Sequence, residues 1–212
     1  MDSCLDPDKR WARALPAVRI FYLLVSLAVV LLGFWQGDIF MAINGLGTVA
    51  LIPFLYIMRR LLRLQGGRAM EVLIYGFICL SWTLGGAAGV YSLVPGFDKA
   101  VHCLSGVLVA MLALAGYRIL EPDSRGTYPP VLYLFVFFAS MAVAALFELC
   151  EFTLAPLLHR DLQHVLDTGV GDTMLDILVC LAGTLVFLFF LFRRSRGKRD
   201  PLTTAAETID IR

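Results

Sequence analysis

The chain has 212 residues, of which 59% are hydrophobic and 17% are charged, and its formal net charge is +1. A soluble domain has about 45–50% apolar and about 25% charged residues, so this composition excludes an ordinary soluble domain. The sequence contains no phosphate-binding loop, nucleotide motif or nucleic-acid-binding patch, so we expect no nucleic-acid partner.

The hydrophobic residues are concentrated in six runs. A helix needs about 20 apolar residues to cross the roughly 30 Å of hydrocarbon in a bilayer. No run alternates apolar and polar residues as a membrane β-strand does, so each is expected to form a helix. In chain order the predicted spans are Ile20–Trp35, Ile39–Met58, Val72–Val94, Ala100–Tyr117, Val131–Phe147 and Met174–Phe192. We therefore predict an all-α integral membrane protein, a six-transmembrane-helix bundle.

The two ends of the chain differ from this hydrophobic middle. The first run ends in an aromatic segment, Gly33-Phe34-Trp35-Gln36, which is a poor signal-peptide cleavage site, so the first helix is expected to be retained. The predicted regions are a cytoplasmic amino-terminal segment (residues 1–19), the bundle (residues 20–194) and a basic, then polar, cytoplasmic tail (residues 195–212). The tail shows no apolar period, so we expect it to be disordered.

The distribution of basic residues predicts the orientation, because Lys and Arg accumulate in cytoplasmic loops. With the amino terminus inside, sixteen of the eighteen Lys and Arg residues are cytoplasmic, and only Lys99 and Arg160 are outside. The opposite orientation reverses these numbers. Both termini are therefore predicted to be cytoplasmic.

Three predicted helices carry a pair of polar residues near their outer ends, three or four positions apart, a spacing that places both on one helix face. An acid at the centre of a span costs about 2.5–3.5 kcal/mol, so such residues should face protein or water. The pairs are Asp98 and His102, Glu148 and Glu151, and Asp172 and Asp176. The sequence thus predicts one shared polar site at the extracytoplasmic membrane face.

Simpler explanations exist for some of these residues. Asp98 and Asp172 could be helix N-caps, and Glu151 could be an ordinary interface residue. Neither explanation fits Glu148, which lies near a helix carboxyl end where acids are disfavoured. Asp176 lies one turn too deep to be a cap.

We consider His102, Glu148 and Asp176 as candidate catalytic residues and all six polar residues as candidate ligands of one divalent metal. One imidazole with several carboxylates suits Zn²⁺, Mn²⁺ or Fe²⁺. Proton sharing among the carboxylates is the alternative to a metal.

The remaining features are less specific. The five cysteines show no metal-binding spacing. The sequence does not decide whether Cys103 and Cys150 form a disulfide. Residues 157–166 have an apolar stripe, which predicts a short amphipathic helix on the outer leaflet, with His159 and His164 solvated.

The polar motifs resemble those of a known family. Asp98, His102 and Gly106 are similar to the "D-x-x-x-H-x-x-x-G" element of the uncharacterised YjdF-type bacterial inner-membrane proteins, and the pairs in the fifth and sixth helices are similar to that family's "E-x-x-E-[WF]" and "D-T-x-x-D" elements. A more distant likeness is to VanZ-like proteins. The likeness covers roughly residues 70–190, with Cys180 where the family often has a polar residue. It implies a multi-pass protein of the bacterial inner membrane and, for VanZ-like members, a connection with envelope antibiotic resistance.

Three functions remain open from the sequence. The first is a metal-dependent hydrolase or transferase acting on a lipid or lipid-linked envelope substrate. The second is an ion- or proton-coupled transporter or small-molecule binder, and the third is a structural scaffold of the envelope. Only isolated Ser and Thr residues are evident in the inner half of the spans, which favours an outward-facing site. The lipid bilayer is the one partner predicted, and the oligomeric state is not predicted.

Overall fold

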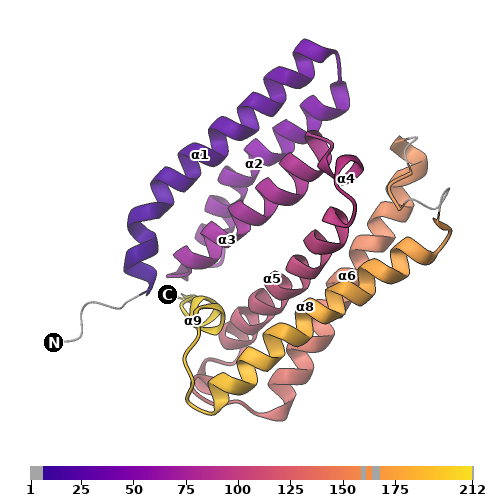
Figure 1. The fold of residues 1–212 in the computed structure, drawn as a ribbon. Coiled ribbons are helices and arrows are strands. Elements are labelled where there is room, and N and C mark those ends of the chain that lie inside the picture. Colours follow the sequence, from indigo (N-terminus) through magenta and orange to yellow (C-terminus); the bar gives the residue numbers. More distant parts are fainter. Residues whose placement is uncertain (1–6, 159–160, 164–167, 212) are drawn as a thin grey trace. The chain divides into compact units, whose positions relative to one another are not determined.

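The computed structural model describes residues 7–158, 161–163 and 168–211 (Figure 1). Within them, six helical segments are long and apolar enough to cross a membrane. They are α1 (Pro7–Gln36), α2 (Ile39–Leu61), α3 (Arg68–Ile78) continued by the π-helix η1 (Cys79–Ala87), α5 (Phe97–Leu120), α6 (Pro130–Leu158) and α8 (Gly171–Ser195). The prediction of a six-helix, all-α membrane protein is confirmed.

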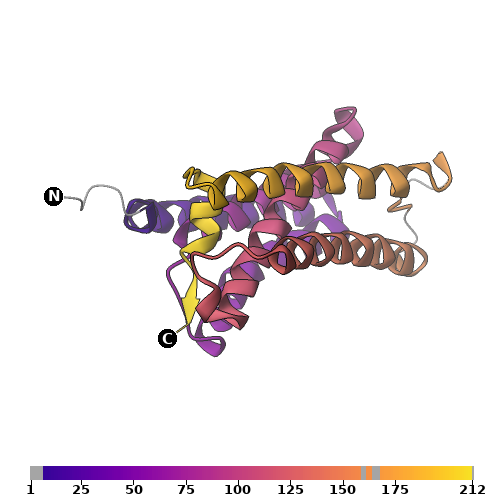
Figure 2. The same cartoon turned by 90° about the horizontal axis from the view of Figure 1, so that it is seen from below.

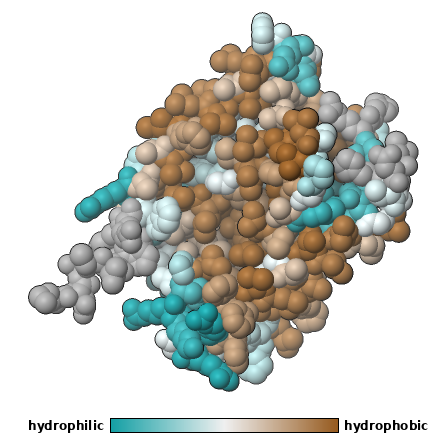
Figure 3. Space-filling view, viewed as in Figure 1, coloured by the Kyte–Doolittle hydropathy of each residue, from teal (hydrophilic) through white to brown (hydrophobic). Residues whose placement is uncertain are grey.

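Most of these helices extend beyond the apolar runs, because polar flanking residues continue them out of the hydrocarbon. The largest extension is in α1, which begins at Pro7, a residue favoured at the first helical position. Side chains in the middle of the helices are largely exposed and hydrophobic, as contact with lipid requires. Figure 3 shows brown, hydrophobic side chains over much of one face and teal, hydrophilic side chains in separate patches.

The chain divides into two compact units, residues 1–101 with 204–212, and residues 102–203. In unit 1, α1, α2 and α3 with η1 pack around a core that contains Leu15, Tyr22 and Tyr75 (Figures 1 and 2). Two glycines allow α1 and α2 to approach closely. A Cβ at Gly33 would lie 2.5 Å from the backbone nitrogen of Ala42, and a Cβ at Gly45 would lie 2.9 Å from that of Val30, so the helices could not keep this separation with larger residues.

The chain from residue 200 onward, expected from the sequence to be disordered, contains regular structure. Helix α9 (Pro201–Glu207) is followed by strand β2 (Asp210–Ile211), which pairs antiparallel with β1 (Leu64–Gln65) in unit 1 (Figure 2). Gly66 has φ +65° and lies under the tail, where a Cβ would be 2.0 Å from the carbonyl oxygen of Thr208. Apolar periodicity does not predict this pairing, because it joins residues that are far apart in the sequence.

In unit 2, α5, α6 and α8 pack together, and the short helix η2 (Pro122–Ser124) lies between α5 and α6. Residues 157–166, expected to form an amphipathic helix, lie partly outside the described residues. Of this segment, Leu157 and Leu158 belong to α6, and Leu162 and Gln163 form a turn. His159 and His164 lie outside the described residues.

Candidate functional site

The site begins where two helices start beside each other. Gly96 has φ +77°, and its carbonyl accepts a bond of 3.0 Å from the backbone nitrogen of Ala100, so the chain turns sharply into α5. Asp98 lies in the first turn of α5 and His102 one turn later. Gly169 makes a similar left-handed turn before α8, which places Asp176 in the second turn of that helix.

His102 and Asp176 face each other across α5 and α8. The distance from His102 Nε2 to Asp176 Oδ1 is 3.9 Å, and the two side chains are 12% and 4% exposed. Asp98 joins them, since one ligand atom from each of the three residues lies within 4.8 Å of the others. The boundary between the two units falls just before His102, but α5 is one continuous helix, so Asp98 and His102 keep a fixed relation.

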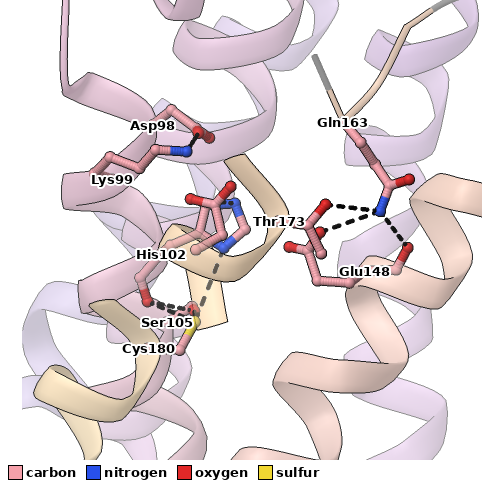
Figure 4. Close-up of polar contacts among 9 residues, drawn as sticks. Asp98, Lys99, His102, Ser105, Glu148, Gln163, Thr173 and Cys180 are labelled. Atoms are coloured by element: carbon pink, nitrogen blue, oxygen red, sulfur yellow. Dashed lines mark hydrogen bonds and ion pairs between the residues drawn. The ribbon is translucent and has the colours of Figure 1, made fainter. Parts of the chain in front are cut away.

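Asp98 is also paired with a cation in the chain. Lys99 Nζ lies 3.0 Å from Asp98 Oδ2 (Figure 4). A metal ion that used both oxygens of Asp98 would compete with this ion pair. The charge of Lys99 therefore weakens cation binding, whereas the buried carboxylate of Asp176 favours it.

The Nδ1 edge of the His102 ring contacts Cys180, which lies one turn beyond Asp176 on α8. Cys180 Sγ is 3.8 Å from His102 Nδ1 and 3.1 Å from the His102 carbonyl oxygen. Ser105 Oγ donates to the same carbonyl at 2.7 Å and lies 3.3 Å from Cys180 Sγ. A proton on Nδ1, directed at the sulfur, would leave the Nε2 lone pair directed toward the carboxylates.

Close packing of α5 and α8 holds these groups in place. A Cβ at Gly106 would lie 2.2 Å from the carbonyl oxygen of Cys180, and a Cβ at Gly183 would lie 1.9 Å from that of Cys103. Ser140 on α6 adds a link, because its hydroxyl lies 2.8 Å from Thr184 Oγ1 and 3.3 Å from the carbonyl of Gly106. These small residues bring the two backbones together.

Glu148 is buried beside a second set of polar groups (Figure 4). Gln163 Nε2 lies 3.3 Å from Glu148 Oε2, 3.1 Å from the Glu148 carbonyl and 3.1 Å from Thr173 Oγ1. Gln163 thus links α6 to α8 from the connection between them. Phe147, the neighbour of Glu148, packs edge-on against the His102 ring at 5.8 Å between centroids.

Among the described residues, the ligand group therefore contains Asp98, His102 and Asp176, three of the six sequence candidates. Glu148, Glu151 and Asp172 are not members of it. Glu151 and Asp172 are half-buried, and both have contacts of their own. Cys103 and Cys150 are free thiols, so the disulfide left open by the sequence is not formed.

Two residues of this region were missed from the sequence. Cys180 was not among the candidate site residues, although its position four residues after Asp176 places both on one face of α8. Gln163 lies in the connection, where polar residues are common, so no local pattern singles it out.

The geometry suits a small cation with two oxygen ligands and one imidazole. Three protein ligands leave coordination positions for water or substrate, which is the arrangement of catalytic rather than structural metal sites. Two carboxylates with one histidine favour Mn²⁺, Fe²⁺ or Zn²⁺ over soft, thiolate-bound metals. Without a metal, the same residues can form a protonated histidine–carboxylate ion pair.

Comparison with known proteins gives a family but no precedent for this site. Residues 17–197 match the family model described as "Predicted membrane protein (DUF2238)". No curated protein and no solved structure matches the chain.

Proposed function

The chain belongs to the DUF2238 family of predicted membrane proteins, and we propose that it binds one divalent metal ion through Asp98, His102 and Asp176. The observation that carries this proposal is the convergence of three ligand atoms within 4.8 Å. They come from two helix ends, in a region where buried charges need partners. The contact between Cys180 Sγ and His102 Nδ1 supports the metal-site proposal further, because metal-bound histidines donate their other ring N–H to a fixed acceptor.

We propose hydrolysis or group transfer on a lipid or lipid-linked substrate as the activity of this site. Bound Zn²⁺, Mn²⁺ or Fe²⁺ supplies Lewis-acid chemistry, polarising an ester or phosphate oxygen or activating water. The role of the chain is to orient the ligands and to hold the site at the membrane face, where headgroups are located. The resemblance to YjdF-type and VanZ-like proteins supports a bacterial inner-membrane location and an envelope substrate, and the distribution of basic residues supports an extracytoplasmic site.

A purely structural ion-pair cluster is the competing explanation. In that case the His102–Asp176 and Asp98–Lys99 pairs would only join the ends of α5 and α8. Such a cluster needs no metal, so the number of metal ions bound per chain separates the two possibilities.

The test is elemental analysis of protein purified in detergent without chelators. We expect about one equivalent of Zn, Mn or Fe per chain in the wild type and a large loss in His102→Ala and Asp176→Asn, because each removes one of three ligands. Asp123→Asn, an exposed acid on η2, is the control and should keep its metal. Folded wild-type protein that contains no metal, and binds none when Zn²⁺, Mn²⁺ or Fe²⁺ is added, would favour the structural ion pair.

Activity is tested on the same samples. Mixed phospholipid vesicles and the isolated lipid-linked envelope precursors would be incubated with the metal-loaded protein, and products measured by mass spectrometry. We expect product release that stops with a chelator and in His102→Ala but continues in Asp123→Asn.

A further inference from the structure

A second polar region lies inside unit 1, in the part of the spans where the sequence suggested only isolated Ser and Thr residues. Glu71 is in the first turn of α3, and its side chain is 5% exposed. Arg19 on α1 donates to Glu71 Oε1 through Nε at 2.8 Å and through Nη2. Arg59 Nη1 on α2 is 3.9 Å from the other oxygen, Oε2, which is too far for a hydrogen bond.

Glu71 Oε2 is consequently buried, and among the described residues no hydrogen-bond donor reaches it with ordinary geometry. A carboxylate oxygen in this state is unusual, because buried polar atoms nearly always have a protein or water partner. The adjacent Arg19 and Arg59 side chains are 40% and 28% exposed, so this cluster reaches the surface of unit 1. A water molecule could therefore reach Glu71 from the basic end of the unit.

Tyr75, one turn after Glu71, also has a buried polar atom whose hydrogen-bonding capacity is not satisfied by ordinary geometry. Tyr22 and Tyr75 are each 1% exposed, and their rings pack at 4.8 Å between centroids. The Tyr22 hydroxyl donates to the carbonyl of Thr48 at 2.8 Å. Among the described residues, the Tyr75 hydroxyl makes no hydrogen bond of ordinary geometry, although Glu71 and Arg19 lie close to it. Two equally buried tyrosines thus differ in whether the protein satisfies their hydroxyl groups.

Two more buried hydroxyls, of Ser26 and Thr83, make no hydrogen bond of ordinary geometry within the described part of the chain, although Ser26 lies close to Tyr22. Ser26 lies one turn after Tyr22 on α1, and Thr83 lies in the π-helix η1, twelve residues after Glu71. With a rise of about 1.5 Å per residue, Glu71 and Thr83 are roughly 18 Å apart along the helix axis. This is more than half of the roughly 30 Å hydrocarbon thickness. Thr83 lies within the π-helix η1, whose turns are wider than those of an α-helix.

We propose that unit 1 contains a chain of bound water molecules that begins at Glu71 and passes Tyr75 and Ser26 to Thr83. One water can donate to Glu71 Oε2 and accept from the Tyr75 hydroxyl, which satisfies both groups at once. The ligand of this second site is therefore water, and the chain forms a partial aqueous path from the basic end of unit 1 toward its middle. Acids within membrane spans often mark such paths.

X-ray hydroxyl-radical footprinting of the full-length protein in nanodiscs tests this proposal, because radicals formed from a bound water oxidise the side chains beside it. We expect the fragment containing Tyr75 to be oxidised about tenfold faster than the fragment containing Met111, which is equally buried at 1% exposure. Met111 is a stringent control, since methionine is intrinsically more reactive toward radicals than tyrosine. Tyr56, which is 56% exposed on α2, gives the rate for a ring at the protein surface. If Tyr75 is protected to the same degree as Met111, unit 1 is dry and the proposal is overturned.

A pair of isosteric substitutions gives a second, independent readout. Thr184→Val in unit 2 removes a hydroxyl that bonds to the protein, at 2.9 Å to the Cys180 carbonyl, and should lower Tm by a few degrees. If water occupies the site at Thr83, Thr83→Val should lower Tm in the same way. A Tm for Thr83→Val that is unchanged or higher would mean that a dry, unsatisfied hydroxyl had been removed, and would contradict the proposal.

Discussion

Cys180 Sγ lies 3.8 Å from His102 Nδ1 and 3.1 Å from the His102 carbonyl oxygen, so one side chain of α8 contacts both the ring and the backbone of the same residue of α5. This arrangement fixes the ring from the side opposite Asp176. The thiol can donate to the carbonyl while its sulfur accepts from Nδ1–H, an arrangement that would correspond to the tautomer with a free Nε2.

Replacing Cys180 should therefore alter metal affinity without removing a ligand. We expect Cys180→Ala to weaken metal binding about 10- to 100-fold, the range found for lost partners of ligating histidines. Cys180→Ser keeps a donor and an acceptor and should lose much less. Competition with a metal-sensitive dye measures both affinities. Equal losses in the Ala and Ser variants would show that the sulfur acts through its size rather than through hydrogen bonding.

The six spans could be predicted from the sequence because the length of an apolar run is a local property. The facing of His102 and Asp176 was also predictable, since each has a polar neighbour four residues earlier and lies at a similar depth. Glu71 was missed because the third span was started at Val72, which left this acid as a flanking residue. The structure begins that helix at Arg68, so Glu71 lies inside it.

Other parts depend on contacts between distant residues, which sequence patterns do not encode. The pairing of Leu64 with Ile211 joins residues that are 147 positions apart in the sequence. The convergence of Glu148 with the other candidates also rested on depth alone. In the structure its carboxylate contacts Gln163, and whether it acts with His102 stays a prediction.

Arg118 gives a prediction about stability. It is 1% exposed at the end of α5, where Nη1 lies 3.1 Å from Ser124 Oγ and also donates to the Ser124 carbonyl. Its Nη2 donates to the Thr127 carbonyl at 2.8 Å, and the guanidinium lies 5.1 Å from the Tyr128 ring centroid. We expect Arg118→Lys to destabilise the protein by about 2–3 kcal/mol, because an ammonium cannot reproduce the planar fork of donors.

The control for Arg118 is Arg125→Lys, since Arg125 is exposed in the same connection. Thermal unfolding followed in detergent should show a clear decrease in Tm for Arg118→Lys and a change within error for Arg125→Lys. Similar Tm values for the two variants would mean that charge alone, rather than hydrogen-bond geometry, holds the connection.

The orientation in the membrane is a further prediction, based on the sixteen-to-two division of basic residues. Reporter fusions after Arg125 and after Arg199 should both show a cytoplasmic location, and a fusion at Gln163 should show an external one. An external carboxyl terminus would reverse the predicted side of the metal site, although its geometry would be unaffected.

The close contact of α5 with α8 leads to the last prediction. A Cβ at Gly183 would lie 1.9 Å from the Cys103 carbonyl oxygen and 3.1 Å from the backbone nitrogen of Val107. Both are backbone atoms, so no side chain can rotate away, and the helices must separate to accept a methyl group. We expect Gly183→Ala to destabilise the protein by about 1–3 kcal/mol, the usual cost of overpacking. It should also weaken metal binding, because Asp176 on α8 would move away from His102 on α5.

Gly116→Ala is the matched control, since Gly116 lies on α5 and a Cβ there would have no atom within 4 Å. Alanine favours the helix by about 0.8–1.0 kcal/mol over glycine, so this variant should be neutral or more stable. Tm and metal content would be measured for both variants in the same detergent. If Gly183→Ala lowers Tm but keeps its full metal content, the ligands tolerate helix separation, and the metal site does not depend on the close contact.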